Sequence, residues 1–111
     1  MDRGEPGVAV VALVGEHESF SLHRLEDTLA AVLDEGCAVV VDLTEATFLD
    51  STTVGVLLQT RDRAARENLG FFMVMDDRTG ASVRRMFDVT GLRSVLPIVG
   101  TRAEAVGAAR G

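Results

Sequence analysis

Three short apolar runs set the strongest limit on how this chain can fold. They span Val8–Val14, Cys37–Leu43 and Phe71–Met75, and only Asp42 interrupts them. Each run is too short for a typical helix and is rich in β-branched or aromatic residues, so each predicts a strand that is covered on both faces. Such strands are typical of a parallel sheet with helices packed against it.

The two segments between these runs have helical spacing. The first has Ser21 as a candidate cap and Gly36 as a stop, and the second is predicted to run from about Thr52 to Asn68 with Gly70 after it. The apolar positions on the buried faces are Leu22, Leu25, Leu29, Val32 and Leu33 in the first helix, and Val54, Leu57, Leu58, Ala65 and Leu69 in the second.

The C-terminal third is predicted to contain a turn at Asp76–Gly80, a helix over Ser82–Val89 and a short edge strand at Leu96–Val99. Thr101 and Glu104 have the spacing of a capping box that opens a last helix. Strands that alternate with helices need crossover connections. The sequence therefore predicts a single α/β domain with a mixed, mainly parallel sheet and helices packed against it.

Charge and cysteine content exclude several classes of function. The 111 residues carry a formal charge of −6, which disfavours nucleic acid and anionic membrane surfaces as partners. No apolar run is long enough to cross a bilayer, so we expect no direct membrane insertion. Cys37 is the only cysteine and the first residues do not resemble a signal peptide, which together predict a cytoplasmic protein.

Motifs for catalysis and cofactor binding are missing from the sequence. Neither phosphate-binding glycine pattern occurs, and His17, His23 and Cys37 do not have the spacing of a zinc site. We therefore predict no metal, no cofactor and no enzymatic activity. The acids Asp76 and Asp77 lie in a predicted turn, where carboxylates usually stabilise the backbone or face water.

The junction before the second predicted helix is the best candidate for a functional site. In VVVDLTEATFLDSTTVGVLL, a buried strand leads through a polar loop to Ser51 at the helix start. Serine there can simply cap the helix, and on residue type alone that interpretation is favoured. However, the four polar residues of Asp50–Thr53 exceed what one cap requires. A small hydrolase that uses Asp50 and Ser51 is a weaker alternative, because the flanking glycines of a nucleophile elbow are missing.

A helical wheel suggests a contact surface beside Ser51. At about 100° per residue, Val56 lies about 200° from Val54, the centre of the predicted buried stripe. We therefore expect Val56 to face solvent as an apolar spot ringed by polar groups. The candidate partner-binding residues are Val56, Gln59, Thr60 and Arg63.

Gly15-Glu16, the junction segment, the strand FFMVM and the segment MFDVTGL together resemble the STAS domain of bacterial anti-sigma-factor antagonists. The likeness covers a core of about residues 8–106 within a single domain of residues 1–111, and its most specific part is DLTEATFLDST. The resemblance implies a sheet preceded by one more N-terminal strand, which is short or missing here because only seven residues precede Val8.

Carried onto this chain, the resemblance implies that Ser51 is a phosphoacceptor, with Asp50, Thr52 and Thr53 supporting its loop. The kinase would be the anti-sigma factor itself, which the unmodified protein would bind to release a sigma factor. Two departures are His17-Glu18, where the family commonly has Leu-Asp, and Thr52-Thr53, where it often has Ser-Gly. Thr52 is therefore a secondary candidate acceptor. The alternative within the resemblance is a partner subunit of a membrane lipid-transporter ATPase.

Overall fold

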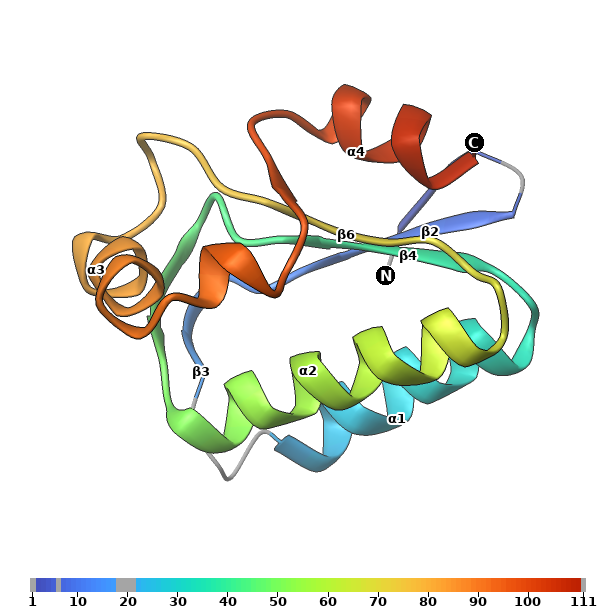
Figure 1. Ribbon diagram of the computed structural model, residues 1–111, viewed down its shortest axis with the longest axis horizontal. Coiled ribbons are helices and arrows are strands. Elements are labelled where there is room, and N and C mark those ends of the chain that lie inside the picture. The colour runs from blue at the N-terminus through green and yellow to red at the C-terminus, as the bar shows by residue number, and fades with distance from the viewer. Residues whose placement is uncertain (1, 6, 18–21, 111) are drawn as a thin grey trace.

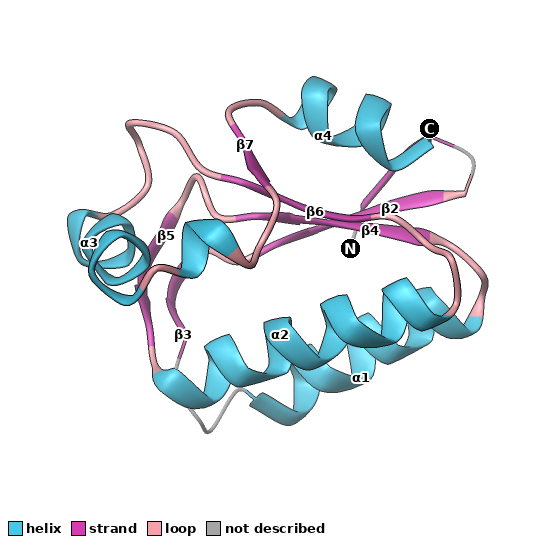
Figure 2. Cartoon of the chain, in the orientation of Figure 1, coloured by secondary structure: helices cyan, strands magenta, loops and turns pink. Residues whose placement is uncertain are grey.

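The computed structural model describes residues 2–5, 7–17 and 22–110. Its main sheet has the strand order β1-β2-β4-β6-β7. β1 (Asp2–Glu5) is antiparallel to β2 (Val8–Ala12), whereas β4 (Ala38–Asp42), β6 (Phe71–Val74) and β7 (Ile98–Val99) all run parallel to β2. The mixed, mainly parallel sheet is thus confirmed, and the N-terminal strand is present in a short form (Figure 2).

Helices cover both faces of the main sheet. α1 (Leu22–Asp34) and α2 (Ser51–Arg66) lie side by side on one face, and α4 (Arg102–Arg110) lies on the other (Figure 1). All five residues of β4 are buried, as expected for a strand covered on both sides. β4 therefore lies at the centre of the molecule, whereas the end of the first apolar run is exposed at Val14.

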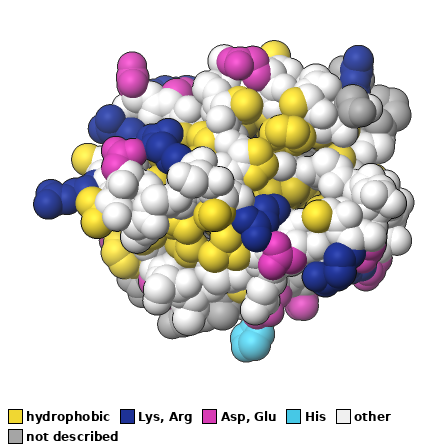
Figure 3. All heavy atoms as spheres, viewed as in Figure 1, with side chains coloured by type: hydrophobic (Ala, Val, Ile, Leu, Met, Phe, Trp, Pro, Cys, Tyr) yellow, Lys and Arg dark blue, Asp and Glu magenta, His cyan; other side chains and the backbone are white. Residues whose placement is uncertain are grey.

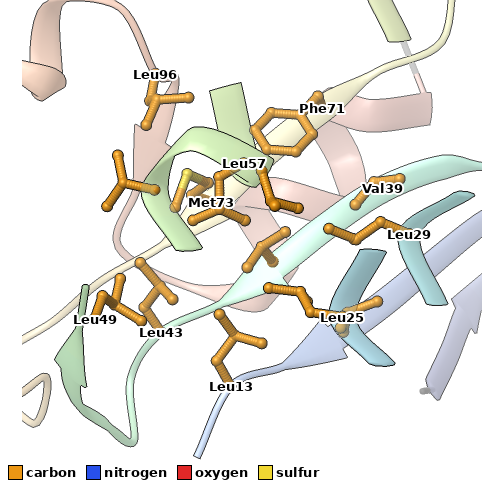
Figure 4. Packing of buried hydrophobic residues seen from close by; sticks show 14 of the residues in the cluster. Leu13, Leu25, Leu29, Val39, Leu43, Leu49, Leu57, Phe71, Met73 and Leu96 are labelled. Carbon is orange, nitrogen blue, oxygen red and sulfur yellow. The ribbon is translucent and has the colours of Figure 1, made fainter. Parts of the chain in front are cut away.

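Alternate residues of β4 belong to two separate parts of the core. Val39 and Val41 pack in the larger cluster with Leu29 of α1 and Leu57 of α2 (Figure 4). Val40, between them, belongs to a smaller cluster with residues of β2, β6 and α4. This alternation follows from the two-residue period of a strand.

A second, two-stranded sheet was not predicted. It consists of β3 (Gly15–His17) and β5 (Ala46–Leu49), which run parallel to each other. The polar residues between β4 and α2 predict an irregular loop there. That prediction was wrong because only Ala46 and Leu49 of β5 are buried, so the strand has no continuous apolar run to reveal it.

The C-terminal elements agree with their predictions except at their boundaries. α3 (Ala81–Thr90) ends at Gly91, which has a positive φ of 74°, and a short 3-10 turn, η2 (Leu92–Ser94), follows. β7 is an edge strand with only two residues. The backbone N–H of Glu104 donates to the Thr101 hydroxyl at 3.1 Å, so the predicted threonine cap of α4 is confirmed.

Apolar surface is visible in the middle of the face shown in Figure 3, where Figure 1 places η2 and β7 between α2 and α4. Both elements contribute partly buried residues to the main core, among them Leu92 and Ile98. Within the described ranges, no helix is long and apolar enough to cross a membrane.

Candidate functional site

The cap of α2 is Asp50 and not Ser51. One carboxylate oxygen of Asp50 accepts the backbone N–H of Thr53 at 2.9 Å, together with the hydroxyls of Thr52 at 2.9 Å and Thr53 at 2.8 Å. The structure thus corrects the interpretation of Ser51 as the N-cap. It also explains the run of polar residues, because the hydroxyls of Thr52 and Thr53 both donate to the capping aspartate.

Ser51 is therefore not needed for helix capping. It is the first residue of α2 and is exposed to solvent. Among the described residues, its hydroxyl has no hydrogen-bond partner. Thr53 differs, because it is 1% exposed and its hydroxyl is bonded. Thr52 is exposed but donates to Asp50. Of the three hydroxyls, that of Ser51 is thus the most accessible to chemical modification.

The chain that leads into Ser51 is held from outside by the start of α3. The N–H of Gly80 donates to the carbonyl of Ala46 at 2.8 Å, and the hydroxyl of Ser82 donates to the carbonyl of Thr47 at 2.9 Å. A Cβ at position 80 would lie 2.8 Å from the Cα of Thr47, so this close approach requires glycine. Sequence reasoning missed this support, which only the tertiary contact between α3 and β5 reveals.

The expectation that Val56 faces solvent is wrong. Val56 is 7% exposed and Thr60 is 8% exposed, and the hydroxyl of Thr60 donates to the carbonyl of Val56 at 2.8 Å. The helical-wheel prediction allowed for a single buried stripe on α2, but α2 packs on the sheet and also against α1. A helix with two neighbours buries a wider arc than a helix that covers a sheet alone.

The four residues proposed for partner binding nevertheless lie together. Val56, Gln59, Thr60 and Arg63 line one surface groove of about 150 Å³ between the two helices. Its other lining residues come from α1 and are Glu26, Ala30 and Leu33.

Arg63 closes this groove through two ion pairs. Its guanidinium contacts Asp34 of α1 at 2.5 Å and Glu67 at 2.6 Å. The hydrogen bonds to Asp34 and Glu67 raise the pKa of Arg63. Gln59, in contrast, is exposed on the outer face of α2.

A polar cavity of about 320 Å³ lies at the carboxyl ends of β4 and β6, beside the start of α4. Asp42 is its buried acid: one oxygen accepts the N–H of Thr44 at 2.8 Å and the other accepts Arg102 at 2.5 Å. Burial by itself raises the pKa of Asp42, but the hydrogen bonds from Thr44 and Arg102 outweigh it, so the pKa is lowered. No local pattern in the sequence indicates the pairing with Arg102, which is 60 residues away.

The turn at Asp76 contributes a second ion pair to the same cavity. Asp76 accepts the backbone N–H of Arg78 at 2.8 Å and pairs with its guanidinium at 2.9 Å. The hydrogen bond from the Arg78 side chain is the main cause of the lowered pKa of Asp76. Asp76 therefore stabilises the turn, whereas Asp77 is exposed.

The remaining candidates are Cys37, His17 and His23. Cys37 is 6% exposed and packs in the main core, as expected for the first residue of a predicted buried run. His23 is exposed on α1, and the side chain of His17 lies outside the described part of the structure. In the described ranges, no three His, Cys, Asp or Glu side chains gather in a way that could hold a metal ion.

Comparison with known proteins explains this combination of a mixed sheet and a strand–helix junction with an exposed serine. The model of the STAS domain family matches residues 1–105. The chain belongs to the STAS domain family. The match covers the described elements from β1 to the first turn of α4, and it includes the junction at Ser51.

Relatives of this STAS domain are anti-sigma factor antagonists. The anti-sigma-B factor antagonist of Listeria monocytogenes is 25% identical over 99 residues, which are 87% of this chain and 83% of the relative. The crystal structure of an anti-sigma factor antagonist from Mycobacterium paratuberculosis is 30% identical with a TM-score of 0.84, and the match covers 100% of this chain and 92% of that one.

The anti-sigma factor antagonist SpoIIAA is a more distant structural neighbour. In its unphosphorylated form it is 21% identical, with a TM-score of 0.75 over 99% of this chain and 94% of that chain. In its phosphorylated form, from Bacillus, the values are 17% and 0.69 over 96% and 95%. At this level of identity, the likeness to SpoIIAA establishes the fold.

Proposed function

We propose that this STAS domain is an anti-sigma factor antagonist whose binding to an anti-sigma factor is switched off by phosphorylation of Ser51. The observation that carries the proposal is the exposed Ser51 hydroxyl, which has no hydrogen-bond partner among the described residues, on a turn that Asp50 already caps. The anti-sigma factor would itself be the serine kinase. The domain would act in the cytoplasm as a binding module without catalysis of its own.

The position of Ser51 separates the effect of a phosphoryl group on folding from its effect on binding. A phosphoserine carries about −1.5 to −2 charge at pH 7. At the first residue of α2 this charge lies near free backbone N–H groups and the positive end of the helix dipole, which favours it by roughly 0.3–1 kcal/mol. The neighbouring Asp50 carboxylate opposes it. We therefore expect the fold to tolerate the modification.

A partner surface shaped for a neutral hydroxyl does not tolerate the same charge. Binding would require desolvation of the dianion, which can cost several kcal/mol and hence orders of magnitude in affinity. In this proposal, Asp50, Thr52 and Thr53 hold the turn that presents Ser51. Thr52 and Gln59 extend the exposed surface along α2, because residues seven apart lie on the same side of a helix.

The proposal can be tested by phosphorylation and binding assays that use the kinase-type anti-sigma factors encoded in the source genome. We expect one of them to bind the unmodified chain and to phosphorylate it with ATP. The same factor should not phosphorylate Ser51→Ala. The alanine variant should bind that factor constitutively, and phosphorylated wild type should bind at least about 100-fold more weakly by calorimetry.

The matched control is Thr52→Ala, which removes the neighbouring hydroxyl. Labelling of Ser51→Ala at the wild-type rate would move the acceptor elsewhere, with Thr52 the first position to examine. If the phosphorylated and unmodified forms bind equally tightly, the switch is wrong even if binding itself is real.

A further inference from the structure

The groove between α1 and α2 has a buried apolar floor. Leu33 and Val56 form the floor and are 3% and 7% exposed. Ala30 also lines the groove, and its small side chain leaves space that a longer one would fill. The groove holds about 150 Å³, the volume of a cavity that takes one benzene ring, and hence of about one apolar side chain.

Charges around the groove are predominantly acidic. Glu26 lies on its α1 side, and its carboxylate has an exposed histidine, His23, at 3.8 Å. Arg63 on the α2 side is the cation of the rim, but Asp34 and Glu67 both pair with it. Asp34 and Glu67 thus neutralise Arg63, and a further cation would complement Glu26 on the opposite side.

The groove lies close to the proposed switch. Val56 follows Ser51 by five residues, which is about 7.5 Å along a helix axis. A partner that covers the Ser51 turn can therefore reach the groove with the same surface. Gln59 lines the groove and is exposed, and it lies on the same side of α2 as the exposed Thr52, which follows Ser51.

From the floor, the volume and the rim charges, we infer that the groove between α1 and α2 receives one aliphatic side chain of the anti-sigma factor. An adjacent lysine or arginine of that partner pairs with Glu26. The inference rests on the proposed function and adds a second contact, which is independent of the Ser51 hydroxyl. In this arrangement the groove contributes affinity for the anti-sigma factor, and phosphorylation of Ser51 switches the binding off.

Filling the groove from inside tests this inference. Ala30→Leu places an aliphatic side chain over Leu33 and Val56, and we expect it to weaken binding of the anti-sigma factor by at least about tenfold with unchanged thermal unfolding. Ala31→Leu is the matched control, because Ala31 is the next residue of α1 and is exposed. The control should bind as wild type does.

A charge pair of variants tests the cation. Glu26→Gln should weaken binding and reduce its salt dependence, whereas Asp27→Asn, at an exposed position one residue further on α1, should change both less. Chemical shifts of the labelled chain should change at Ala30 and Leu33 when the partner is added.

The outcomes separate the two proposals. If wild type binds and Ser51 phosphorylation abolishes binding, but Ala30→Leu binds as tightly as Ala31→Leu does, the groove inference is overturned and the proposed function stands. If no anti-sigma factor binds wild type, both fall. If Ala30→Leu instead changes the self-association of the chain alone in sedimentation, the occupant is a second copy and the inference is wrong.

Discussion

Asp42 and Asp50 stand at comparable places in the chain, and the structure uses them for different purposes. Asp42 ends β4 and accepts the N–H of Thr44, while Asp50 follows β5 and accepts the N–H of Thr53. Asp42 also binds Arg102 of α4 and is 5% exposed. Asp50 instead receives the hydroxyls of the threonines that follow it.

This difference separates a long-range clamp from a local support. The Asp42 junction ties the last helix to the centre of the sheet through a charged pair. The Asp50 junction orders one helical turn and leaves Ser51 exposed beside it. We therefore expect changes at Asp42 to act mainly on stability, and changes at Asp50 to act on both stability and the proposed modification.

The largest effect in this comparison is expected for Asp42→Asn. The amide cannot accept from both Thr44 and Arg102 with the strength of a carboxylate, and it leaves Arg102 without its buried counter-charge. The free energy of unfolding should fall by about 1–3 kcal/mol in urea denaturation. Asp77→Asn, in an exposed turn position, is the control and should change it by less than about 0.5 kcal/mol. Equal losses in the two variants would contradict the clamp.

A smaller loss of stability is expected for Asp50→Ala, because a helix N-cap typically contributes about 0.5–2 kcal/mol. The exposed turn should also become less ordered, so labelling of Ser51 by the kinase should slow. Ser51→Ala is the control for stability and should be nearly neutral, since Asp50 is the cap. If Ser51→Ala is the more destabilising of the two, the capping assignment is wrong.

The smallest expected effect is on the dependence of stability on acidic pH. The pKa of Asp42 lies below its ordinary value of 3.8 in the folded chain, so its ionised form contributes stability that is fully present above that value. This contribution disappears as the pH falls from 3.8 through the lowered folded pKa. Wild type should lose stability more steeply than Asp42→Asn in this window, as measured by denaturant unfolding at a series of pH values. Parallel curves would show that Asp42 is not linked to folding.

The apolar runs of the sequence were sufficient to predict β2, β4 and β6, and helical spacing predicted α1 and α2. A strand that is buried on both faces needs a continuous apolar run, so its position can be predicted from its own residues. Ser51 could be selected in the same way, because a hydroxyl at the end of a strand–helix junction is a local feature. The pairing of β3 with β5 has no comparable local pattern in the sequence.

The surroundings of Ser51 were decided by tertiary structure. The sequence showed which residues stand at the start of α2, but whether Val56 faces water depends on α1, which packs beside it and buries it. Likewise, Gly80 and Ser82 of the α3 start hold β5 across a gap of more than 30 residues. Local composition fixes which face of a helix is apolar. How many neighbours share that face depends on contacts between distant parts of the chain, and a helical wheel of one element contains no information about them.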